Sequence, residues 1–242
     1  MPQNKIVINL PSLIGKGYAS FWNTKKFYRI VKGGRGSKKS TTTAMWYIYN
    51  LMKYPKSNLV CIRQTANTNR DSTFAELKKA ATRFGVYDKW KFTTNPMECT
   101  YLPTGQKILF RGFDEVLKLT SMNVEVGYLC WAWFEEAYEI EDEDAFDTFV
   151  EAIRGKMEED AKDLFKQITV TYNPWVNSHW TKTRFWDVEP CPDNVFRLTT
   201  THKCNEWLDE EDHQRIEDLA ITNPDRYKVV GLGEYGIPGG AY

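Results

Sequence analysis

Short apolar runs alternate with amphipathic stretches along most of the chain. The apolar runs are a few residues long and rich in β-branched or aromatic side chains, which is typical of strands, whereas the amphipathic stretches have apolar residues at helical spacing. The predicted strands are residues 27–32, 58–63, 97–101, 107–110, 126–134, 165–171 and 195–199. The predicted helices are residues 40–52, 72–84, 143–154 and 209–222. This alternation indicates an α/β fold with a mostly parallel central sheet and helices on both of its faces.

Local signals refine three of these elements. A Pro-Thr-Gly turn signal separates residues 97–101 from residues 107–110, so we expect these two strands to pair as a hairpin. Ser72 or Thr73 is a suitable N-cap for the second helix, because its hydroxyl can accept a backbone N–H of the first turn. Residues 126–134 are almost entirely apolar, which predicts a strand that is buried on both faces.

The composition narrows the class of protein. The 242 residues include 32 basic and 32 acidic side chains, so the formal net charge is zero, and 42% of the residues are hydrophobic, which excludes a wholly disordered chain. No apolar run approaches the roughly 20 residues of a membrane helix, and the N-terminal residues show no secretory-signal pattern. The five cysteines include no close pair, which suits a reducing compartment. We therefore expect a soluble intracellular protein.

The charges are nevertheless distributed unevenly along the chain. Residues 25–39 carry seven basic side chains and no acid, and residues 134–147 carry eight acids and no base. Taken alone, each run is most simply explained as a solvated face. Each run, however, includes the end of a predicted strand, which is where nucleotide-binding α/β proteins place their site.

The basic run contains a glycine-rich loop between the first predicted strand and its helix. The sequence matches the phosphate-loop pattern G-x-x-x-x-G-K-[ST] at Gly33, Lys39 and Ser40, but has Lys38 in place of the second glycine. In such loops, backbone N–H groups and the helix N-terminus bind the β- and γ-phosphates, the lysine adds a positive charge and the hydroxyl ligates Mg²⁺. The alternative is a basic surface turn. The order of strand, loop and helix favours nucleotide binding.

The acidic run begins at the end of the strand predicted at residues 126–134. A phosphate-loop ATPase needs a carboxylate at the end of a buried strand for the Mg²⁺ shell, and a second carboxylate that activates the attacking water. By position, Glu135 is the expected metal carboxylate, although aspartate is more usual, and Glu136 is the expected general base. The alternative is an apolar strand that leads into an acidic, solvated helix. The two features together predict an ATPase.

Several segments, in the same order, resemble the ATPase (motor) domain of the large terminase subunit of tailed bacteriophages. Residues 32–37 are similar to the family's GGRGS-type loop, residues 133–137 to its acidic strand end, and residues 169–174 to its TxNP coupling motif. Further matches are Arg63, residues 71–77, residues 110–112, residues 179–180 and residues 233–236. The likeness runs from about residue 27 to the C-terminus, and its main departure is Lys38.

The resemblance implies a RecA-like phosphate-loop ATPase that hydrolyses Mg²⁺-ATP and uses the cycle to translocate double-stranded DNA into a procapsid. It also implies that Thr171 and Asn173 relay the state of the γ-phosphate. An arginine is expected to stabilise charge on the transferring phosphoryl group. The candidates are Arg35, Arg63, Arg70 and Arg111. Arg35 ranks first because the loop itself carries it.

The expected site residues fall into three groups. The catalytic residues are Glu136, Arg35, Thr171 and Asn173. The residues that bind ATP and its phosphates are Gly33, Gly34, Arg35, Gly36, Ser37, Lys38, Lys39, Ser40 and Thr41. The metal ligands are Ser40 and Glu135, the latter through water. Mg²⁺ is the expected cofactor, and ATP is the substrate.

We expect residues 1–242 to form a single ATPase domain. It consists of an N-terminal extension (1–26), a nucleotide-binding core (27–200) and a C-terminal segment (201–242) that leads toward a nuclease domain absent from this chain. No nuclease site is assigned. The resemblance implies double-stranded DNA, the portal protein and the small terminase subunit as partners, and a homo-oligomeric ring as the working motor. The isolated domain can be a monomer. The implied location is the bacterial host cytoplasm, on the procapsid, without membrane contact.

Two other functions are compatible with the same features. A RecA-like helicase or strand-remodelling ATPase would use the same site chemistry. A non-hydrolysing module that binds nucleotide or DNA would follow if Lys38 had degraded the loop.

Overall fold

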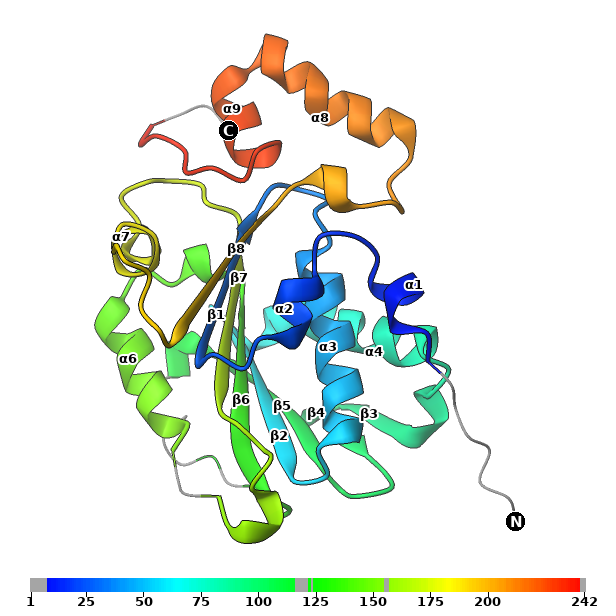
Figure 1. Ribbon diagram of the computed structural model, residues 1–242. Coiled ribbons are helices and arrows are strands. Elements are labelled where there is room, and N and C mark those ends of the chain that lie inside the picture. Colours follow the sequence, from blue (N-terminus) through cyan, green and yellow to red (C-terminus); the bar gives the residue numbers. More distant parts are fainter. Residues whose placement is uncertain (1–7, 116–121, 123, 155–156, 240–242) are drawn as a thin grey trace.

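An eight-stranded sheet in the order β3-β4-β5-β2-β6-β7-β1-β8 forms the centre of the protein (Figure 1). The computed structural model describes residues 8–115, 122, 124–154 and 157–239. The strands are β1 (Tyr28–Gly33), β2 (Ser57–Arg63), β3 (Trp90–Thr94), β4 (Met97–Tyr101), β5 (Lys107–Gly112), β6 (Tyr128–Glu135), β7 (Gln167–Tyr172) and β8 (Val195–Thr200). Among the described residues, the pairs β5–β2, β2–β6, β6–β7, β7–β1 and β1–β8 are parallel, and the pairs β3–β4 and β4–β5 are antiparallel. The predicted mostly parallel sheet and the hairpin are confirmed.

Helices cover both faces of this sheet (Figure 1). The set α1 to α4 lies on one face, α6 and α7 lie on the other, and α8 and α9 lie above the carboxyl ends of the parallel strands. The helices are α1 (Leu10–Ile14), α2 (Ala19–Asn23), α3 (Lys39–Lys53), α4 (Ala75–Arg83), α6 (Glu143–Ala152), α7 (Trp180–Phe185), α8 (Glu210–Thr222) and α9 (Pro224–Val230). Within the described residues, no helix combines the length and the apolar character that spanning a membrane requires.

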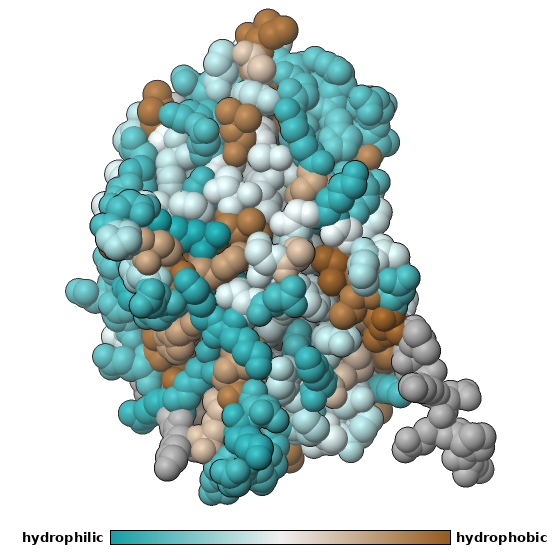
Figure 2. Space-filling model, viewed as in Figure 1, coloured by the Kyte–Doolittle hydropathy of each residue, from teal (hydrophilic) through white to brown (hydrophobic). Residues whose placement is uncertain are grey.

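Two hydrophobic cores lie on opposite faces of the sheet, and β6 contributes to both. Trp131 and Trp133 pack into the core beneath α3, whereas Ala132 and Phe134 pack into the core beneath α6. Side chains of a strand alternate between the two faces, so an apolar strand can be buried on both of them. The predicted strand that is buried on both faces is therefore confirmed, but it begins at Tyr128, and Val126 is exposed before it. On the face drawn in Figure 2, hydrophobic residues form small scattered groups between hydrophilic ones.

The predicted N-cap of the second helix is wrong. Residues Arg70–Phe74 already form a wide helical turn that continues into α4 without a side-chain cap. The Ser72 hydroxyl donates to Thr68 O (2.8 Å), and the Thr73 hydroxyl donates to Asn69 Oδ1 (2.8 Å). Both hydroxyls therefore bond back to the preceding turn. The helices α1, α2, α7 and α9 and the strand β3 were not predicted. The N-terminal stretch, in which no signal sequence is predicted, includes residues 1–7, which lie outside the described residues.

Candidate nucleotide-binding site

The glycine-rich loop lies at the carboxyl end of the parallel strands, between β1 and α3. The first residue of α3 is Lys39, and the backbone N–H of Thr42 donates to Lys38 O (2.8 Å). The N–H groups of a helix before this first intrahelical bond have no acceptor within the helix. Together with the helix dipole, they favour binding of an anion at this point.

Gly34 brings the loop into close contact with the C-terminal segment. Its N–H donates to Thr200 O (3.0 Å), and the next N–H, of Arg35, donates to Val230 O (2.9 Å). A Cβ atom on Gly34 would lie 2.0 Å from Val230 O. The loop is thus attached to the ends of β8 and α9, and only glycine fits at this position.

We expect Gly34→Ala to lower the free energy of unfolding by about 3 kcal/mol, the upper end for overpacked sites. The clash is with a backbone oxygen, so rotation of a side chain cannot relieve it. Chemical denaturation measures the change. Gly85→Ala is the control, because its φ is 67° but a Cβ there meets nothing within 4 Å, so it reports only the backbone cost of about 1–2 kcal/mol. A smaller loss for Gly34→Ala than for Gly85→Ala would contradict the close contact.

Lys38 occupies the position at which the pattern has glycine. Its φ of 65° and ψ of 12° are left-handed, which explains the preference for glycine there. The Lys38 side chain is buried, with 1% of it exposed, and its Nζ lies 2.5 Å from Glu206 Oε2. The side chain therefore points to Glu206 and away from the start of α3. Only the backbone N–H of Lys38 remains for the expected role in phosphate binding.

Lys39, Ser40 and Thr41 extend from the first turn of α3. The buried Lys39 Nζ donates to Gly34 O (3.0 Å) and Gly33 O (3.2 Å). Burial lowers the pKa of Lys39 to about 8, although nearby carboxylates favour its charged form. The Ser40 hydroxyl donates to Glu135 Oε1 (3.0 Å), whereas the Thr41 hydroxyl donates to a carboxylate on α4.

The two acids at the end of β6 lie next to these side chains. Burial, together with the charge of Glu136, raises the pKa of Glu135 to about 7, against the opposing effects of Arg63 and Ser40. Arg63 Nη1 lies 2.9 Å from Glu135 Oε2 but is not aligned for a hydrogen bond, so this buried oxygen accepts none. Glu136 has a left-handed backbone (φ 53°), and burial raises the pKa of its carboxyl as well. Strained backbone of this kind is common at functional sites.

The structure separates the four arginine candidates. Arg63 bridges the acids, with Nη1 near Glu135 and Nη2 hydrogen-bonded to Glu139 (3.1 Å). Arg35 is exposed on the loop, but its charge lowers the pKa of Glu136 slightly against the larger effect of burial. Arg70 is exposed, and Arg111 donates to the carbonyl of Phe110. Arg63 is therefore the candidate that contacts an expected site residue through its side chain.

Thr171 and Asn173 lie at the end of β7, between β6 and β1. Thr171 pairs with Glu135 in the sheet register, but its hydroxyl accepts the indole N–H of Trp133 (2.9 Å). Asn173 Nδ2 donates to Gly33 O (2.7 Å). Asn173 therefore touches the glycine-rich loop directly, whereas the Thr171 hydroxyl is engaged within the sheet.

Sequence reasoning missed several residues that complete this site. Glu139 lies in the acidic run that was explained as a solvated face, and its pairing with Arg63 has no local signal. Thr200 at the end of β8, together with Glu206 and Val230 of the C-terminal segment, holds the loop. These three contacts join residues more than a hundred positions apart, so no motif or spacing could have shown them.

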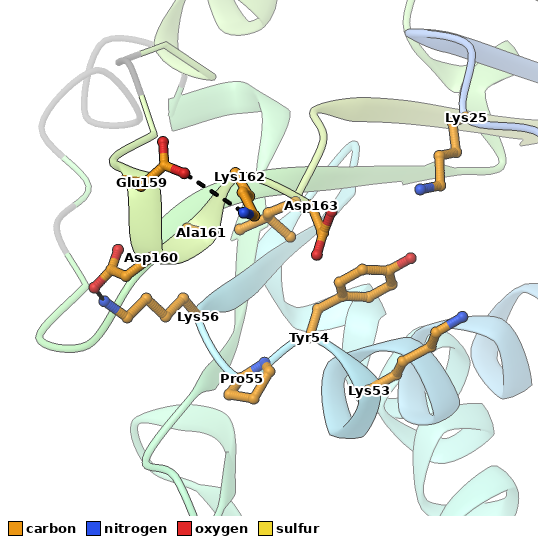
Figure 3. A pocket seen from close by; sticks show the side chains of 11 residues that line it. Lys25, Lys53, Tyr54, Pro55, Lys56, Glu159, Asp160, Ala161, Lys162 and Asp163 are labelled. Carbon is orange, nitrogen blue, oxygen red and sulfur yellow. Dashed lines mark hydrogen bonds and ion pairs between the residues drawn. The ribbon is translucent and has the colours of Figure 1, made fainter.

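A cavity of about 670 Å³ lies at the far end of α3, away from this site (Figure 3). It opens between Tyr54 and the turn at residues 159–163, where Lys162 and Glu159 form an ion pair (3.5 Å). No residue of the glycine-rich loop lines it. The candidate site is therefore the arrangement of side chains at the carboxyl end of the sheet and not this cavity.

Known proteins resemble the chain over most of its length. A family model described as phage terminase large subunit matches residues 25–234. The large terminase subunit of Bacillus phage SPP1 is 31% identical over 228 residues, which cover 90% of this chain and 52% of that protein. The PBSX phage terminase large subunit of Bacillus subtilis is 26% identical over 90% of this chain and 51% of the relative. The chain thus spans about half the length of the curated relatives it matches.

Solved structures show the same fold at lower identity. The large terminase of a thermophilic bacteriophage aligns with a TM-score of 0.69 and 15% identity, over 90% of this chain and 50% of that one. The same protein in complex with ADP gives a TM-score of 0.68 at 17% identity, over 87% and 48%. The large terminase ATPase domain of Thermus phage P74-26 gives 0.63 at 14% identity, over 96% of this chain and all of that one. The fold is thus the RecA-like α/β architecture of these domains, and the chain belongs to the phage terminase large subunit family.

Proposed function

We propose that this chain is the motor domain of a DNA-packaging terminase, which hydrolyses Mg²⁺-ATP and couples the reaction to translocation of double-stranded DNA into a procapsid. The observation that supports this proposal most directly is that side chains from three separate elements meet at one end of the sheet. Lys39 and Ser40 come from α3, Arg63 from β2, and Glu135 from β6, with Ser40 and Glu135 in direct contact at 3.0 Å. ADP and ATP-γ-S complexes of the thermophilic-phage terminase, which has the same fold, support nucleotide use.

The donor atoms fit Mg²⁺ as the cofactor. The Ser40 hydroxyl and the Glu135 carboxylate are oxygen ligands of the kind that Mg²⁺ prefers, and Glu135 Oε2 is buried without a hydrogen bond. No larger group of metal-binding side chains is present in the described part of the chain. Mg²⁺ would therefore bind together with nucleotide phosphates and neutralise charge on them.

The remaining residues take complementary roles in this proposal. Lys39 and the backbone N–H groups from Gly36 to Thr41 bind the phosphates, because the N–H groups of Gly34 and Arg35 donate to Thr200 O and Val230 O. Glu136 accepts the proton of the water whose oxygen attacks the γ-phosphorus, as ADP leaves. Arg63 or Arg35 stabilises the charge on the transferring group.

Asn173 is the proposed link between the reaction and motion. Its amide holds Gly33, the first glycine of the loop, and the backbone of the next residue bonds to the C-terminal segment, with Gly236 N–H donating to Pro174 O (3.0 Å). A shift of the loop would therefore reach that segment through Asn173. Thr171 positions the end of β7 through its bond with Trp133.

The domain organisation and the partners also belong to the proposal. Residues 27–200 form the nucleotide-binding core, preceded by an extension (1–26) and followed by a C-terminal segment (201–242). Family membership supports double-stranded DNA, a portal protein and a small terminase subunit as partners of a homo-oligomeric ring in the bacterial host cytoplasm. No nuclease function is assigned to these residues.

Displacement of a third strand from a triplex on double-stranded DNA tests this function against its alternatives. A translocating motor removes the third strand in the presence of Mg²⁺-ATP and leaves the duplex intact. A helicase also separates the duplex, and a binding module displaces nothing and releases no phosphate from ATP. Either of the last two results would contradict the proposed function.

A further inference from the structure

The Lys38 side chain connects three segments that are distant in sequence. Its Nζ donates to Ile14 O (3.2 Å), to Lys16 O (3.2 Å) and to Glu206 Oε2 (2.5 Å). The other oxygen of Glu206 accepts the backbone N–H of Lys16 (3.2 Å). We call this group the Lys38 clasp: Lys38, Glu206 and the backbone of residues 14–16.

The clasp is not an ordinary surface ion pair. The Lys38 side chain is 1% exposed, compared with 36% for Glu206. The ammonium also lies 4.8 Å from the ring of Trp207, and carbonyl oxygens satisfy its other protons. A buried ammonium is costly without a counter-charge, so its position depends strongly on Glu206.

The same residue has the strained backbone of the loop. A left-handed φ of 65° is unfavourable for lysine and would be neutral for glycine. The chain adopts it because the side chain is held at its far end, 168 residues away in sequence. Asn205 adds a second contact from the same segment, since its Nδ2 donates to Gly36 O (2.6 Å). The shape of the loop is thus maintained from outside the loop.

We propose that Lys38 is a positioning residue, whose clasp with Glu206 holds the phosphate loop in its nucleotide-binding shape. Nucleotide affinity then depends on Glu206, although Lys38 and not Glu206 belongs to the loop. This inference rests on the proposed nucleotide-binding function. This role explains the departure from the phosphate-loop pattern. Lysine lacks the conformational freedom of glycine, but its side chain attaches the loop to residues 14–16 and to the segment before α8.

The test is Glu206→Gln, measured in the wild-type background and in a Lys38→Gly background. With Lys38 present, we expect Mg²⁺-ADP to bind about five- to tenfold more weakly, because a neutral amide replaces the carboxylate that balances the buried ammonium and leaves a weaker hydrogen bond. Amide hydrogen exchange of residues 33–38 is expected to become faster in the same variant. In the Lys38→Gly background, the second substitution is expected to change neither quantity, because no ammonium remains to be held and glycine adopts the left-handed conformation without strain. The control is Glu210→Gln, an exposed acid on the first turn of α8 that forms no ion pair with another described residue.

Two results would overturn the clasp. One is unchanged exchange of residues 33–38 in Glu206→Gln with Lys38 present. The other is an equal effect of Glu206→Gln in both backgrounds, which would mean that Glu206 acts without Lys38. Failure of the wild-type chain to bind Mg²⁺-ADP would instead contradict the proposed function, and hydrogen exchange would still decide whether the clasp exists.

Discussion

Glu136→Gln is expected to lower the rate of ATP hydrolysis about 10²–10⁴-fold, the usual contribution of a general base. Glutamine has the same shape as glutamate and can occupy the same left-handed position, but it cannot accept the proton of the attacking water. Nucleotide binding should stay within about threefold of wild type, because Glu136 raises the pKa of Glu135 and its neutralisation favours the ionised metal carboxylate.

Two measurements made side by side check this expectation. Steady-state phosphate release gives the rate, and equilibrium titration with Mg²⁺-ATP-γ-S gives the affinity. Glu141→Gln is the matched control, because Glu141 is an exposed acid of the same run. Turnover of Glu136→Gln at the rate of this control would exclude Glu136 as the general base.

Lys39→Met is expected to weaken binding of Mg²⁺-ATP-γ-S by roughly 100-fold, equivalent to about 3 kcal/mol for lost charge-assisted hydrogen bonds. Methionine retains most of the aliphatic stem in its buried place, so the loop keeps its packing. The ammonium now bonds to Gly33 O and Gly34 O. These weak neutral acceptors leave it free to turn to a phosphate.

Lys53→Met provides the control for this substitution. Lys53 lies on the last turn of the same helix, α3, and is exposed. Isothermal titration of both variants, with circular dichroism to confirm folding, separates loss of the site from loss of structure. Equal affinities for the two variants would mean that nucleotide does not bind at the N-terminus of α3.

The parts of the fold that were predictable have local causes. An apolar strand such as β6 must alternate its side chains between two cores, and its period and length reveal this in the sequence. The turn signal between β4 and β5 acts over a few residues and correctly predicted the hairpin. The N-cap predicted at Ser72 or Thr73 is wrong because the helical structure already begins at Arg70, and hydroxyl chemistry alone cannot show this.

In the candidate site, too, features with local causes were predictable and contacts between distant segments were not. The loop and the end of β6 were predicted from residue types at fixed spacing, and the structure brings Ser40 and Glu135 within 3.0 Å of each other. The sequence could not show which arginine contacts the acids, because Arg63 reaches Glu135 only through the pairing of β2 with β6. The partner of Lys38 is set by the path of the C-terminal segment over the loop, for which the sequence contains no local signal.

The most direct test of this account is Mg²⁺-dependent release of phosphate from ATP by the wild-type chain and by Lys39→Met, with double-stranded DNA present. We predict that the wild-type chain releases phosphate, that chelation of Mg²⁺ stops the reaction, and that Lys39→Met is inactive at ATP concentrations that saturate the wild type. Release that continues without Mg²⁺, or that proceeds equally in Lys39→Met, would contradict a phosphate-loop ATPase at the junction of β1 and α3.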